Sequence, residues 1–127
     1  MRWQIVFAGL SGAIMVAMGA WAAHSDVGAT SRAWLETGAQ YGLWHSIALV
    51  AVAAVAARAQ PSRLLTLSGI AFAAGIVLFS GTLFLRALTP LYWVSKATPL
   101  GGLCFIAGWL LLAAWGVARY LEDDSQG

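Results

Sequence analysis

Two histidines, His24 and His45, are the side chains of this sequence best suited to hold a metal ion or a cofactor. His45 lies in the stretch QYGLWHSIAL at 40–49, four residues after Tyr41, so a helix would place both on one face. Burial favours the neutral imidazole, the form that meets a metal ion, a haem iron or a quinone carbonyl. The same ring could instead bond to a facing carbonyl or hydroxyl and join two helices, because an unpaired buried polar group is costly. Of these two interpretations we favour the structural one.

Several catalytic arrangements are missing from the sequence. A single cysteine, Cys104, excludes the cysteine pair of a thiol-oxidising membrane enzyme, and two histidines are too few for a di-haem cytochrome with four axial histidines. Asp26 and Glu36 are the carboxylates nearest to the histidines, and two histidines with a carboxylate could hold a metal ion, although nothing fixes the geometry. We therefore expect no catalytic residues and no enzymatic activity.

The composition indicates a membrane protein. Of 127 residues, 61% are hydrophobic and 9% charged, with a mean hydropathy of +0.78. Four uncharged apolar runs, at about 4–23, 39–57, 64–85 and 99–118, are each long enough to cross a hydrocarbon core about 30 Å thick as a helix. They lack the alternation of a membrane barrel. We predict an all-α, integral membrane, four-helix up-down bundle forming one domain over 1–120, with a polar tail at 121–127.

The ends of these segments carry recognisable signals. The first run exceeds the core of a secretory signal peptide, so we expect it to be retained as a helix. Thr30 or Ser31 suits the N-cap of a helix leading into the second span, and Thr98 with Pro99 suits the N-cap and first position of the fourth.

The distribution of basic residues favours both termini in the cytoplasm. That orientation puts four cations inside and three outside; the inner ones are Arg2, Arg58, Arg63 and Arg119, and the outer ones Arg32, Arg86 and Lys96. The charges are scattered, which does not favour nucleic acid as a partner. At the outer side Arg86 with Lys96 could bind an anion or a lipid headgroup. Counting along the helices also places His24 and His45 in the outer half of the membrane.

Small residues recur along the apolar segments. Gly9, Ala13 and Ala17 repeat every fourth residue on the first segment, and Gly69, Ala73 and Gly81 share a face of the third. In lipid this spacing lets helix backbones approach closely. We expect it to make the bundle compact.

Four motifs together resemble a known family. GAWAAH at 19–24, QYGLWHSIAL at 40–49, LFSGTLF at 78–84 and TPLGGLCFIAGWLLL at 98–112 are similar, in order and spacing, to the bacterial membrane proteins called domain of unknown function 423. The resemblance implies a four-helix, multi-pass protein of the bacterial inner membrane with mitochondrial relatives and no established activity. The family pattern falls on His24, Gln40, Tyr41, His45, Ser80, Gly81, Thr98, Pro99, Gly101 and Gly102, and the sequence departs from it at Arg86 and in 89–96.

The sequence supports three functional hypotheses. The first is a non-enzymatic structural or accessory protein that packs against itself, as a homo-oligomer, or against a larger membrane complex. The second is a membrane-embedded binding protein for haem, metal, quinone or lipid, in which the candidate cofactor-binding residues converge in the outer half of the bundle; these are His24, Gln40, Tyr41, His45 and Thr98. The third, a small oligomeric permease, has the least support because no charge within the spans is available for coupling.

Overall fold

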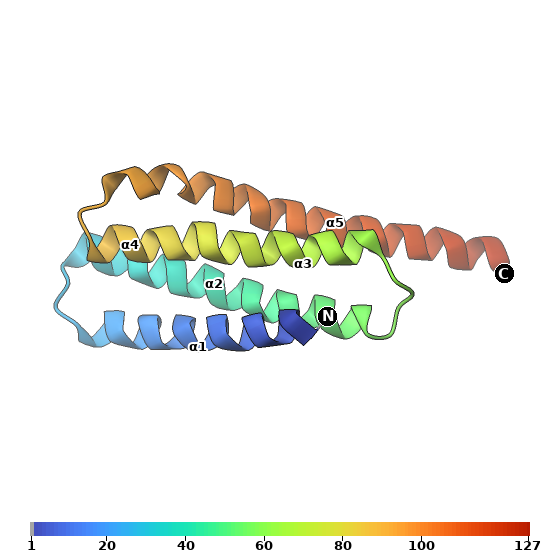
Figure 1. Ribbon diagram of the computed structural model, residues 1–127, viewed down its shortest axis with the longest axis horizontal. Coiled ribbons are helices and arrows are strands. Elements are labelled where there is room, and N and C mark those ends of the chain that lie inside the picture. The colour runs from blue at the N-terminus through green and yellow to red at the C-terminus, as the bar shows by residue number, and fades with distance from the viewer. Residues whose placement is uncertain (1) are drawn as a thin grey trace.

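Four long helices run up and down in the computed structural model, which describes residues 2–127 (Figure 1). They are α1 (Arg2–His24), α2 (Ala29–Ala56), a third rod made of α3 (Arg63–Gly75), the π-helix η1 (Ile76–Gly81) and α4 (Thr82–Leu88), and finally α5 (Thr98–Gln126). A short 3-10 helix, η2 (Tyr92–Lys96), joins α4 to α5. The all-α four-helix bundle predicted from the sequence is confirmed.

Each of the four rods is long and apolar enough to cross a membrane. Two helices extend well beyond their predicted spans, by ten residues at the start of α2 and eight at the end of α5. α2 begins at Ala29, before the predicted start at 39, and α5 continues as helix through the polar tail to Gln126. α5 consequently projects beyond the other helices, at the end of the bundle where α1 begins (Figure 1).

The turn between α1 and α2 is held by backbone groups rather than by a capping hydroxyl. Gly28, with φ of 77°, occupies the N-cap of α2 and accepts the amide of Arg32 at 3.0 Å. The guanidinium of Arg32 also donates to the carbonyl oxygens of Ala23 and Ser25, at 3.3 and 2.7 Å. The predicted N-cap at Thr30 or Ser31 is therefore wrong, because a glycine that tolerates positive φ turns the chain one or two residues earlier.

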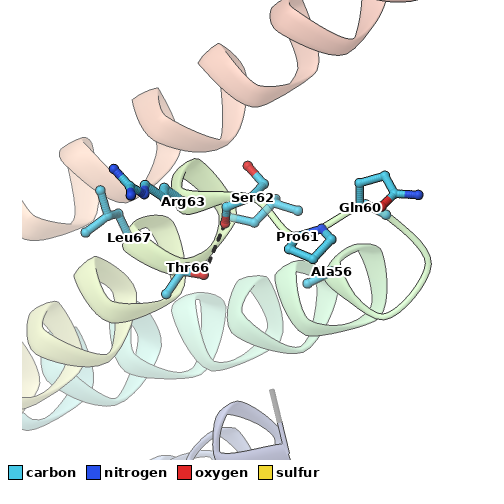
Figure 2. A pocket seen from close by; sticks show the side chains of 9 residues that line it. Ala56, Gln60, Pro61, Ser62, Arg63, Thr66 and Leu67 are labelled. Atoms are coloured by element: carbon cyan, nitrogen blue, oxygen red, sulfur yellow. Dashed lines mark hydrogen bonds between the residues drawn. The ribbon is translucent and has the colours of Figure 1, made fainter.

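The turn between α2 and α3 is shown in Figure 2. Pro61 precedes Ser62, which is the N-cap residue of α3 in an extended conformation. The carbonyl oxygen of Ser62 accepts both the backbone amide and the hydroxyl of Thr66, each at 3.1 Å. These two bonds close the first turn of α3 beside an open cavity of about 600 Å³ that also borders Gln60 and Arg63.

α2 lies at the centre of the bundle, against α1 on one side and the α3–η1–α4 rod on the other, while α5 packs mainly on α3 and η1. α2 and α5 approach each other less closely than the helices that follow one another in the chain. Their contact is made by ring side chains, and His45 is one of them.

Candidate functional site

His45 uses one ring nitrogen within α2 and the other to join α2 to α5. Nδ1 lies 2.6 Å from the carbonyl oxygen of Tyr41, which can only accept, so Nδ1 carries the proton. Nε2 then accepts the indole N–H of Trp109 at 3.2 Å. The side chain is 6% exposed and has both hydrogen-bonding groups satisfied. The bond to Trp109 joins two helices, but its partner is an indole N–H and not the facing carbonyl or hydroxyl expected from the sequence. A metal ion could take Nε2 only by displacing Trp109.

Aromatic rings surround the imidazole. The ring of Phe105 stacks on it with centroids 3.5 Å apart and planes 9° apart, and Phe72 and Trp109 lie within 5.7 and 6.2 Å. Beside them is a cavity of about 600 Å³, lined on its apolar walls by Tyr41, Phe79 and the α5 face from Pro99 to Trp109. Such a volume is within the range of small-molecule pockets, about 300–1,000 Å³.

His45 lies near the middle of the length of the bundle. The neighbouring Ser46 shares a hydrogen bond of 2.7 Å with Ser11, which is about midway along α1. Trp109, the partner of His45, is eleven residues into α5, about 16 Å from its start at a rise of 1.5 Å per residue. The sequence count took Gln40 as its starting point, whereas α2 begins at Ala29, so His45 lies further along the helix than it does along the apolar span. Its placement in the outer half of the membrane stays a prediction.

A second polar contact forms nearer the α4–α5 turn. Thr98 is the first residue of α5, and its hydroxyl lies 2.6 Å from that of Thr82. The Thr82 hydroxyl also reaches the carbonyl oxygens of Leu78 and Phe79, at 2.5 and 3.1 Å, in the π-helix η1. Ala97 occupies the N-cap that the sequence assigned to Thr98. Thr98 links two helices because its hydroxyl has a partner on α4.

The π-helix shapes the seam between the third rod and α5. Ser80 turns inward and donates to the carbonyl oxygen of Gly38 on α2 at 2.6 Å. On the other side, Gly101 of α5 lies directly against the backbone of Leu78 and Phe79, so that a Cβ there would overlap backbone atoms. Glycine is required at 101 because two helix backbones touch there.

The candidate residues from the sequence divide into separate places. Tyr41 and His45 border one cavity, whereas Thr98 borders another with Trp34 and Arg86. His24 and Gln40 are exposed and share neither cavity. Within residues 2–127, no group of three or more histidine, cysteine, aspartate or glutamate side chains is placed to hold a metal ion. The possible site of two histidines and a carboxylate is therefore not formed.

Sequence reasoning missed Trp109 and Gln4. Trp109 stands in the apolar stretch GWLLL, where only its indole N–H indicates that a partner is needed. Gln4 is fully buried against Gly69 of α3, and neither its amide nitrogen nor its carbonyl oxygen has a hydrogen-bond partner within residues 2–127. A glutamine inside a predicted span was the available signal.

Known proteins similar to this chain are themselves described as membrane proteins. The chain is 40% identical over 114 residues to the UPF0382 inner membrane protein YgdD of Escherichia coli (strain K12), covering 87% of this chain and 86% of that protein. It is 33% identical over 124 residues to the UPF0382 membrane protein YwdK of Bacillus subtilis (strain 168), covering 95% and 100%. A UPF0382 membrane protein of Haemophilus influenzae is 39% identical over 107 residues, covering 82% and 85%.

No solved structure matches the chain. The family described as "Protein of unknown function (DUF423)" matches residues 15–102, which include α2, the whole third rod and the start of α5. His45, Ser80, Thr82, Thr98 and Gly101 all lie inside this range. With four helices able to span a membrane and relatives named as inner membrane proteins, the chain belongs to the DUF423 family of multi-pass membrane proteins, as its sequence motifs predicted.

Proposed function

We propose that the protein is a non-enzymatic accessory component of the membrane. It packs the face of α1 that is turned away from its own bundle against a transmembrane helix of a second copy or of a larger complex. The observation that carries the proposal is the position of Gly9, Ala13 and Ala17. All three are exposed, and nothing lies within 4 Å of the position where a Cβ would stand on Gly9.

α1 uses a different face to join its own bundle. Its buried residues include Ala8, Ser11 and Met15, and Ser11 bonds to Ser46 of α2. The stripe of small residues therefore remains exposed in the folded bundle, contrary to the expectation that it serves packing within the bundle. In lipid, helices associate by close backbone approach, for which glycine and alanine at every fourth position are suited. Apart from Gln4, the polar side chains of the bundle interior described above form bonds between helices. These bonds support a structural role over a catalytic one.

Native mass spectrometry in mild detergent tests this proposal. We expect the wild-type protein to appear as an oligomer or with a copurifying membrane protein, and Ala13→Leu to lose that species because the larger side chain holds the backbones apart. Ala107→Leu, at an exposed position of α5, is the matched control and should retain it. A wild-type protein that is strictly monomeric and without a partner would contradict the proposal.

A second candidate function is supported by the cavity beside His45. Its walls of Tyr41, Phe79, Phe105 and Trp109 suit a flat ring or an acyl chain, such as a quinone or a lipid. Haem or a metal ion suits it less, because Nε2 of His45 already accepts Trp109. Mass spectrometry and absorption spectra of the purified protein would detect a quinone or lipid in stoichiometric amount; absence of both would overturn this candidate.

We also propose that both termini lie in the cytoplasm. The two termini are at the same end of the bundle (Figure 1), together with the α2–α3 turn that carries Arg58 and Arg63. A cytoplasmic reporter fused after Gln126 should be active, and a periplasmic reporter at the same position should be inactive; the reverse result would invert the orientation.

A further inference from the structure

Arg86 occupies an unusual position at the end of the bundle formed by the α1–α2 and α4–α5 turns. It lies in the last turn of α4, half-buried. Its guanidinium carbon is 4.5 Å from the centroid of the Trp34 ring on α2 and 4.3 Å from that of Tyr92 on η2. Contacts of a guanidinium with the faces of two aromatic rings restrict where the side chain can point.

The charge of Arg86 is not neutralised by the protein. Within residues 2–127 the one ion pair joins Arg119 to Glu122, far along α5, and the Arg86 guanidinium has no hydrogen-bond acceptor there. Aromatic faces engage the π-surface of a guanidinium but leave the N–H groups at its edge free. The guanidinium of Arg86 is therefore a positive charge in a restricted position, and its planar N–H donors match the oxygens of a phosphate group.

A cavity of about 470 Å³ adjoins this cation. Trp34, Phe79, Leu83 and Pro99 form its apolar walls, and Ser95 and Thr98 add hydroxyl groups next to Arg86. The hydroxyl of Thr98 is shared with Thr82, whereas that of Ser95 has no partner within residues 2–127. The Arg86 guanidinium, the Ser95 hydroxyl and the apolar wall together suit one kind of molecule. It has a phosphate group at one end and a hydrocarbon chain at the other.

The depth of the cavity favours a lipid as the source of that phosphate. It lies at the turn between α4 and α5, where η2 exposes Tyr92 and Trp93, each 68% exposed. Aromatic side chains of this kind gather at the headgroup level of a membrane, and basic residues there attract anionic lipids. Lys96, at the end of η2, adds a second cation without a carboxylate partner in residues 2–127.

We propose that Arg86, held by Trp34 and Tyr92, binds the phosphate of an anionic phospholipid whose hydrocarbon lies along Phe79 and Leu83. This site adjoins the His45 cavity, with which it shares the walls formed by Phe79 and Pro99, but its charged group is Arg86. It is separate from the α1 face and goes beyond the accessory role. The lipid would occupy a fixed place on the bundle surface instead of exchanging freely with the bilayer.

Native mass spectrometry of the full-length, delipidated protein tests the proposal by titration with phosphatidylglycerol or phosphatidylcholine. We expect tighter binding of phosphatidylglycerol, and we expect Arg86→Gln to reduce that preference about fivefold, the ratio that one basic residue contributes near an anionic surface. Arg58→Gln, at the opposite end of the bundle, should leave the preference unchanged. Millimolar inorganic phosphate should not displace the lipid, because it cannot use the apolar wall.

Two further variants keep the test decisive if Arg86→Gln fails to fold. Arg86→Lys keeps the charge but loses the planar donors, and Tyr92→Leu alters an exposed ring that contacts the guanidinium; both should weaken binding of phosphatidylglycerol. The proposal is overturned if folded variants at Arg86 and Tyr92 bind phosphatidylglycerol as the wild type does, or if the wild type does not prefer it to phosphatidylcholine. Displacement by inorganic phosphate would overturn the lipid as ligand and assign the site to soluble phosphate.

Discussion

Trp109→Phe should destabilise the bundle by removing the N–H that satisfies His45. Phenylalanine keeps an aromatic ring against Phe72, which lies 5.1 Å from the Trp109 ring, but donates no hydrogen bond. Interhelical hydrogen bonds in membranes average about 0.6 kcal/mol and reach about 1.7 kcal/mol. Because His45 is 6% exposed and its Nδ1 is already bonded to Tyr41, Nε2 has no replacement partner, and we expect a loss near the upper value, about 1–2 kcal/mol.

The assay is reversible unfolding in mild detergent titrated with a denaturing detergent, followed by circular dichroism. Trp21→Phe is the matched control, because Trp21 is 44% exposed and Trp109 48% exposed, and Trp21 makes no hydrogen bond within residues 2–127. An equal loss of stability in both variants would refute the reasoning.

A double-mutant cycle separates this bond from the aromatic packing. His45→Ala alone should cost about 1–3 kcal/mol, and in that background Trp109→Phe should cost much less than in the wild type. Additive effects would mean that the two side chains do not interact and would contradict the assigned hydrogen bond.

Three other substitutions probe the remaining contacts by the same unfolding assay. Gly101→Ala should destabilise the bundle by about 2 kcal/mol or more, because its methyl group would overlap the backbone at Phe79, which cannot move aside as a side chain can. Ser80→Ala should cost about 0.6–1.7 kcal/mol through loss of the bond to Gly38. Gln4→Met should raise stability by about 1 kcal/mol, because it replaces a fully buried amide that has no partner within residues 2–127 with an apolar side chain of similar length.

Controls for these variants exist in the same chain. Gly116→Ala places a methyl group where nothing lies within 4 Å, so it should be nearly neutral. A Gly101→Ala protein as stable as Gly116→Ala would contradict the close contact between α5 and η1. A Gln4→Met protein less stable than the wild type would show that the amide has a polar partner.

The sequence predicted the architecture well because the bilayer imposes a simple rule. An uncharged apolar run of about 20 residues predicts a membrane-crossing helix. The structure has a helix long and apolar enough to cross a membrane at each of the four predicted runs. Helix ends were predicted less well. Gly28, rather than Thr30 or Ser31, is the N-cap of α2, since a positive φ at glycine changes the chain direction without any capping hydroxyl.

Partners across the bundle could not be derived from local sequence. The bond between His45 and Trp109 joins residues 64 positions apart, and the helix crossing that produces it depends on how the glycines allow the backbones to pack. The π-helix at Ile76–Gly81 also has no sequence signature, although it determines how Ser80 and Thr82 meet their acceptors. Tyr41 was correctly placed beside His45 because residues four apart on a helix are neighbours whatever surrounds them.

Site-specific photo-crosslinking in intact bacterial membranes tests the accessory role most directly. A photoreactive residue at Ala13, in the exposed stripe of α1, should give one discrete crosslinked species, either a dimer of this chain or an adduct with one membrane protein. The same residue at Ala107, on the exposed face of α5, should give none. Products at neither position, or the same diffuse products at both, would contradict the claim that the protein acts by packing its α1 face against a partner helix.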